Sequence, residues 1–119
     1  MKNLDLDCAE LGRNLAEDNG IDEKVFTAAL AVLEEQGPYA CFLYLKARQG
    51  EAGERIGRKA AEFLSKVFSD QNQGNDALAF VKGLADDLDQ LLFARDLLRQ
   101  AFVYARYHAK ARASTGDEQ

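Results

Sequence analysis

Few side chains in this sequence could carry out catalysis. His108 is the only histidine, which excludes a metal site with two histidine ligands, and no nucleophile or carboxylate lies one helical turn from it. Cys8 and Cys41 do not have metal-ligand spacing, so we expect two reduced thiols, with Cys41 in the core. The glycines of residues 50–57 lack the Gly-Lys-Ser/Thr sequence of a phosphate-binding loop. We therefore expect no enzyme, no metal site and no cofactor.

The basic residues carry more information, because they gather in one part of a chain whose net charge is −5. Residues 1–36 contain nine acids and three bases, whereas residues 37–116 contain nine acids and twelve bases. After Asp96 the next acid is Asp117, and bases accumulate between the two. This polarised distribution indicates contact with a polyanion or with an acidic protein surface.

Two helical faces hold the candidate contacts. In residues 52–69, three bases and one acid recur at steps of four, three and four, which places them on one face of a helix. In the last helix the bases lie mostly outside the apolar stripe, and Tyr104 and Tyr107 could stack on unpaired nucleotide bases. The predicted nucleic-acid-binding residues are Arg58, Lys59, Lys66, Arg99, Arg106 and Lys110. The alternative is that both faces are ordinary charged surfaces in contact with water.

Arg95 differs from the other bases because it lies on the apolar seam of the last helix. A guanidinium is seldom left unpaired in a protein core. The neighbouring Asp96 points in another direction, since consecutive residues on a helix do not face each other. We therefore predict a structural ion pair between Arg95 and a carboxylate of another helix, in preference to a ligand contact.

Apolar residues recur at three- and four-residue steps, which predicts an all-α fold without strands. The predicted helices cover residues 4–18, 22–36, 38–49, 52–69 and a last helix that ends at 112, with a polar loop at 70–75. Asn19-Gly20 and Gly37-Pro38 provide the breaks between the first three. Gly83 leaves open whether residues 76–112 form one helix or two. We expect a compact bundle of five to six helices with a long C-terminal helix.

Length and composition fit one globular domain, because 119 residues with 47% hydrophobic and 29% charged residues are typical of one. We assign residues 1–112 to a single helical domain and 113–119 to a disordered C-terminal tail. No apolar run approaches the roughly 20 residues of a membrane-spanning helix, and the first residues do not resemble a secretion signal. We expect a cytoplasmic protein.

The order of these segments resembles the small subunit of the Cmr-type (type III-B) CRISPR RNA-guided effector complex. The resemblance covers roughly residues 22–112. It is carried by an apolar segment at residues 32–45, a polar hinge at 48–50, the end of a second helix at 63–68, and two runs of the closing helix at 91–98 and 104–109. Arg95 and Asp96 match an Arg-acid pair of the closing helix of that family, and Arg106 matches its late basic position.

The resemblance implies a non-catalytic, all-helical subunit of an antiviral ribonucleoprotein complex. It implies that several copies stack beside the subunits that hold the guide RNA, and that basic surfaces on the copies line the channel for the target RNA. The expected partners are other subunits of the effector complex, further copies of the chain, and guide and target RNA. Neither a membrane nor a small-molecule substrate is expected. The alternative is a protein-only helical adaptor or a homo-oligomeric bundle, in which the basic face of one copy meets the acidic front of the next, head to tail.

Overall fold

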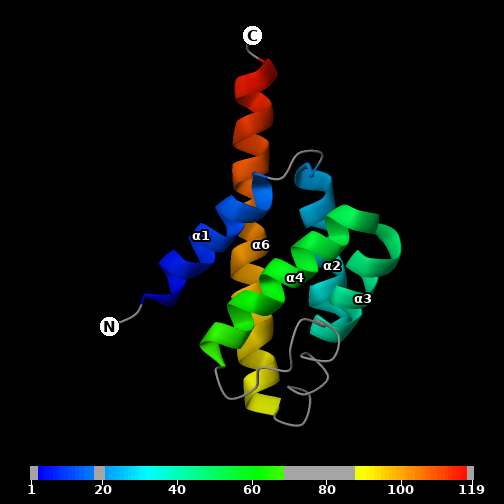
Figure 1. Ribbon diagram of the computed structural model, residues 1–119, viewed down its shortest axis with the longest axis vertical. Helices are drawn as coiled ribbons and strands as arrows, with labels where there is room; N and C mark the ends of the chain where they lie inside the picture. Colours follow the sequence, from blue (N-terminus) through cyan, green and yellow to red (C-terminus); the bar gives the residue numbers. More distant parts are fainter. Residues whose placement is uncertain (1–2, 18–20, 69–87, 118–119) are drawn as a thin grey trace.

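The computed structural model describes residues 3–17, 21–68 and 88–117, and within them the regular structure is entirely helical (Figure 1). The helices are α1 (Leu4–Ala16), α2 (Glu23–Gln36), α3 (Pro38–Arg48), α4 (Gly50–Val67) and α6 (Leu88–Asp117). The predicted all-α fold with a long C-terminal helix is therefore confirmed. The predicted loop at 70–75 and the choice between one and two helices in 76–112 fall on residues 69–87, which lie outside the described part.

The helix ends follow from local side-chain chemistry. Asn3 accepts a hydrogen bond from the backbone N–H of Leu6 at 3.2 Å, and Asp22 accepts one from that of Lys24 at 3.0 Å, so each caps the helix it precedes. Gly37 has a positive φ of 95°, which ends α2, and the following proline begins α3. α6 continues to Asp117, beyond the end predicted at 112. Disorder of the tail in solution stays a prediction.

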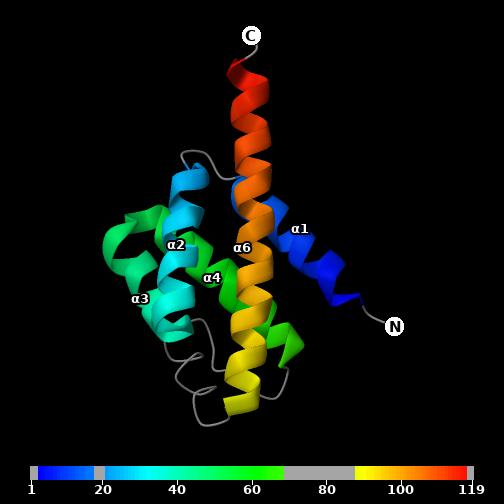
Figure 2. The ribbon, with the colours of Figure 1, turned by 180° about the vertical axis from the view of Figure 1, so that it is seen from behind.

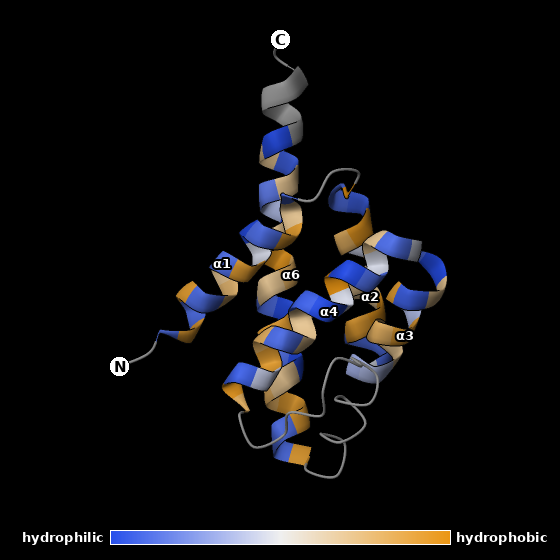
Figure 3. Cartoon of the chain, viewed as in Figure 1, coloured by the Kyte–Doolittle hydropathy of each residue, from blue (hydrophilic) through white to orange (hydrophobic). Residues whose placement is uncertain are grey.

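The long helix α6 organises the fold. In two opposite views α1 crosses it and α2 runs beside it, while α3 and α4 pair with each other (Figures 1 and 2). The ring centres of Phe26 on α2 and Phe102 on α6 are 6.4 Å apart, and both side chains are fully buried in the core. Hydrophilic and hydrophobic residues alternate along the helices (Figure 3), and the buried residues are apolar, although some large apolar side chains, such as Leu43 and Leu92, are exposed. None of the described helices is both long and apolar enough to cross a membrane.

Two glycines allow the closest approaches between helices. A Cβ atom on Gly12 of α1 would lie 2.6 Å from Cβ of Tyr104 and 2.7 Å from the backbone oxygen of Ala101, both on α6. A Cβ atom on Gly53 of α4 would meet the backbone oxygen of Leu45 on α3. The absence of a side chain at these two positions therefore sets how tightly α1 packs on α6 and α4 packs on α3.

Both cysteine thiols are buried and bonded to backbone oxygens. The Sγ of Cys8 donates to the carbonyl of Leu97 at 3.6 Å, and that of Cys41 donates to the carbonyl of Ala29 at 3.5 Å. Burial, with Asp5 and Asp7 adding to it, raises the pKa of Cys8 to about 11, and burial raises the pKa of Cys41 to about 12. The prediction of two free thiols with Cys41 in the core is confirmed.

These pKa values predict a loss of stability at alkaline pH. An unfolded thiol ionises near its ordinary pKa of 9.0, whereas the folded thiols ionise about two and three pH units higher. The stabilisation from the neutral thiols is thus complete below pH 9.0 and declines as the pH rises toward 11–12. The free energy of unfolding in urea should fall across this range. The double variant Cys8→Ala, Cys41→Ala should show a shallower fall, and equal slopes would contradict the assignment.

Candidate functional site

Four bases lie along one edge of α6 and form what we call the α6 stripe: Arg95, Arg99, Arg106 and Lys110. Their spacings of four, seven and four residues keep them close to one line on a helix with 3.6 residues per turn. From first to last the stripe spans about 22 Å. Arg99 and Lys110 are exposed, whereas Arg95 and Arg106 are half-buried.

Contacts orient two members of the stripe. The Nε of Arg99 lies 3.3 Å from a carboxylate oxygen of Glu34 on α2, and both side chains are about half exposed (56% and 47%). The guanidinium of Arg106 lies 5.8 Å from the ring centre of Tyr107, which is itself 61% exposed. Such contacts are weak in water, so they hold the cations in place without neutralising them fully.

The part of the chain that the structure describes shows no carboxylate paired with Arg95. A fully buried guanidinium needs an ion-pair partner, but the Arg95 side chain is only half-buried. Water therefore reaches it, and the physical need for an ion pair is weaker than the sequence indicated. The ion pair stays a prediction.

The three predicted bases of α4 lie apart from the α6 stripe. Lys59 and Lys66 line a groove between α1 and α4. Arg58 is exposed on the outer surface, one helical turn from Glu54 on one side and from Glu62 on the other. The six predicted residues therefore occupy two places, and those on α4 are interleaved with acids.

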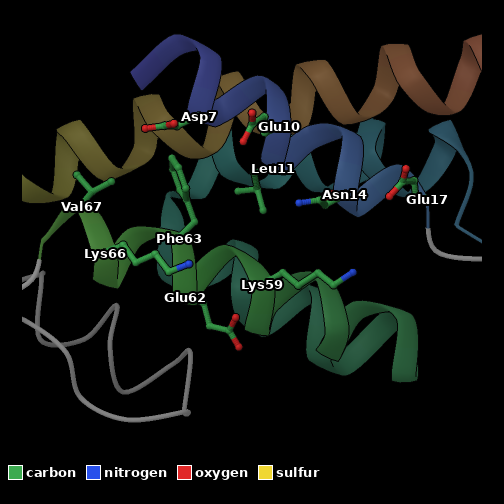
Figure 4. A pocket seen from close by; sticks show the side chains of 10 residues that line it. All are labelled: Asp7, Glu10, Leu11, Asn14, Glu17, Lys59, Glu62, Phe63, Lys66 and Val67. Atoms are coloured by element: carbon green, nitrogen blue, oxygen red, sulfur yellow. The ribbon is translucent and has the colours of Figure 1, made fainter. Parts of the chain in front are cut away.

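This groove has a volume of about 490 Å³ and walls of unequal charge (Figure 4). Its apolar floor is formed by Leu11, Phe63 and Val67. The α1 wall carries Asp7, Glu10, Asn14 and Glu17, and the α4 wall carries Lys59, Glu62 and Lys66. No local pattern in the sequence indicates this site, because the two walls are separated by about 50 residues and meet only through the crossing of α1 and α4.

The opposite edge of α6 is occupied by contacts with α1. Tyr104 donates its hydroxyl hydrogen to a carboxylate oxygen of Asp5 at 2.9 Å, and Gln100 donates to the same oxygen at 2.5 Å. The hydrogen bond to Asp5 is the main cause that raises the pKa of Tyr104. Tyr104 thus fastens α1 to α6. Of the two tyrosines predicted to stack on nucleotide bases, Tyr107 is the exposed one.

His108 has an exposed side chain on α6 and does not line the groove. Within residues 3–17, 21–68 and 88–117, no group of three or more histidine, cysteine or acidic residues could hold a metal ion. That the protein is not an enzyme stays a prediction.

Comparisons of the chain with protein-family models, with curated proteins and with solved structures gave no match. The α6 stripe and the groove between α1 and α4 are therefore the features of the chain that bear on its function.

Proposed function

We propose that the chain is a non-catalytic small subunit of a type III CRISPR ribonucleoprotein effector complex, and that it contacts target RNA through Arg99, Arg106 and Lys110 of the α6 stripe. The observation that carries this proposal is the alignment of these three bases on one edge of a long helix. The segments 95–98 and 104–109, which are the most specific parts of the resemblance to this family, both lie on α6.

The α6 stripe suits the phosphate backbone of an extended RNA strand. Its cations are spaced by one or two helical turns, and phosphate contacts position a strand without selecting its sequence. The ion pair between Arg99 and Glu34 is exposed and contributes about 0–1 kcal/mol, so a phosphate can displace the carboxylate at little cost. One copy offers few contacts, and repeated copies along a complex would add to the affinity.

The α4 bases are less suited to RNA than the sequence suggested. Lys59 and Lys66 lie across the groove from Asp7, Glu10 and Glu17. A phosphate that approached these lysines would be repelled by the carboxylates of α1. We therefore propose that RNA contacts α6 and does not contact Lys59 and Lys66 of α4.

A protein-only adaptor is the second candidate, and the charge distribution favours it too. The acids of α1 and the bases of α6 lie on separate surfaces, so the α6 stripe of one copy could meet α1 of another. In that case the stripe would bind carboxylates and not phosphates.

Recovery of the tagged chain from its native locus separates the two candidates. A small subunit should co-purify with several other proteins and a short guide RNA, and its removal should weaken target binding without abolishing the cleavage chemistry. The measurement is protein and RNA content after purification at low salt. Recovery of the chain alone, or with protein but no RNA, would contradict the proposal and favour the adaptor.

A further inference from the structure

The groove between α1 and α4 is a concave surface that the proposed RNA contact does not use. α1 packs mainly on α6, and α4 packs mainly on α3, so α1 and α4 touch each other over a short stretch. Between them Leu11, Phe63 and Val67 form an apolar floor, and the last two are only partly buried. The floor leaves apolar surface that a partner could cover.

The charges on the two walls differ in sign. On α1, Asp7 and Glu10 have no ion-pair partner among the described residues, and Glu17 has only an exposed contact with Arg13 at 3.5 Å. On α4, Lys59 and Lys66 extend along the groove, while the Glu62 carboxylate points away from α1 (Figure 4). A bound segment should therefore present bases toward α1 and acids toward α4.

The walls also limit the backbone conformation of a bound segment. Both walls are helices, so most of their backbone N–H and C=O groups are already bonded within α1 and α4, and the carbonyls of the last turn of each helix are the exceptions. An extended peptide in the groove would find few backbone partners, whereas a helix satisfies its own backbone. The α1 wall from Asp7 to Glu17 is about 15 Å long, which matches about three helical turns.

We infer that this groove binds an amphipathic helix of another protein. That helix would place an apolar stripe on Leu11, Phe63 and Val67, a basic edge along the carboxylates of α1, and acidic residues beside Lys66. Helix-in-groove recognition of this kind uses apolar anchors at steps of three and four residues. The inference is independent of the proposed RNA contact, because Arg99 of the α6 stripe meets α2, whereas the groove lies between α1 and α4.

Three synthetic peptides about four turns long serve as probes. The first has a leucine stripe with lysines on one edge and glutamates on the other, the second has the same stripe with glutamates on both edges, and the third is a scramble of the first. The full-length protein should bind the first peptide at least about tenfold more tightly than the other two, as measured by fluorescence anisotropy.

Charge reversal on the α1 wall should reverse the preference of the protein for the mixed-charge peptide. The variant Glu10→Lys, Glu17→Lys makes both walls basic, so it should prefer the all-glutamate peptide over the mixed one. The matched control Glu35→Lys, Glu54→Lys changes the net charge equally at exposed positions outside the groove and should keep the native preference. Circular dichroism verifies that both variants remain folded.

Three results would overturn the inference. The scrambled peptide could bind as tightly as the mixed one, or the control variant could exchange the preference as well. Sedimentation could instead show self-association that the Glu10→Lys, Glu17→Lys variant abolishes, in which case the occupant is a second copy. Charge reversal of the α6 stripe should weaken target-RNA binding and leave peptide binding unchanged. Failure of one proposal is therefore distinguishable from failure of the other.

Discussion

Reversing three charges of the α6 stripe should remove most of the salt-dependent affinity of the assembled complex for target RNA. The changes are Arg99→Glu, Arg106→Glu and Lys110→Glu. Each lost phosphate contact lowers the slope of log affinity against log salt by about 0.7 for a single strand, so the slope should fall by about 2. At low salt the affinity should fall at least about tenfold, since the glutamates also repel phosphate. Filter binding across a salt series measures both quantities.

A control variant reverses the two lysines of the groove. Lys59→Glu, Lys66→Glu should change RNA affinity less than about threefold, because these lysines already face carboxylates of α1. RNA contact through α6 would be contradicted if the control weakened binding as much as the α6 variant did. A complex in which neither variant changed the salt slope would remove the RNA proposal altogether.

Replacing Gly53 with alanine should destabilise the protein by about 2 kcal/mol, the middle of the usual range for overpacking. A Cβ atom at this position would meet the backbone oxygen of Leu45 and would lie 2.6 Å from its carbonyl carbon. Backbone atoms cannot rotate away as a side chain can, so α3 and α4 must separate. The expected fall in Tm is about 8 °C.

Gly57 on the same helix provides the control for this prediction. A Cβ atom there would lie 3.4 Å from the Phe42 ring, which is ordinary van der Waals distance. Gly57→Ala should therefore keep most of the gain in helix propensity, up to about 1 kcal/mol, and raise the Tm or leave it unchanged. Thermal unfolding followed by circular dichroism measures both variants. Equal destabilisation of the two would show that helix separation is not the cause.

Most of the fold could be predicted from the sequence, because its signals are local. The periodicity of apolar residues marks the helices, and Asp22 and Gly37-Pro38 mark where α2 begins and ends. For Gly53 and Gly57 the sequence indicates only that they do not form a phosphate-binding loop. Their structural role depends on the backbone of α3, which no local pattern reveals.

The candidate site could be predicted only for residues that share a helix. The spacing of Arg99, Arg106 and Lys110 in the sequence predicts a shared helix face, and in the structure the three residues lie along one edge of α6. Lys59 and Lys66 also share a face as predicted, but that face meets the acids of α1. Which helix lies opposite another is decided by packing across the whole chain, so the electrostatic surroundings of α4 could not be derived.

The contacts between α1 and α6 impose an order on folding during synthesis. Asp5 meets Tyr104, which is 99 residues further along the chain, and Cys8 meets Leu97. At 5–20 residues per second the ribosome takes about 5 to 20 s to produce the partner of α1 after α1 itself. Helices α2, α3 and α4 have neighbours close in sequence and can pair in that time. The apolar stripe of α1 must therefore wait until α6 has been made.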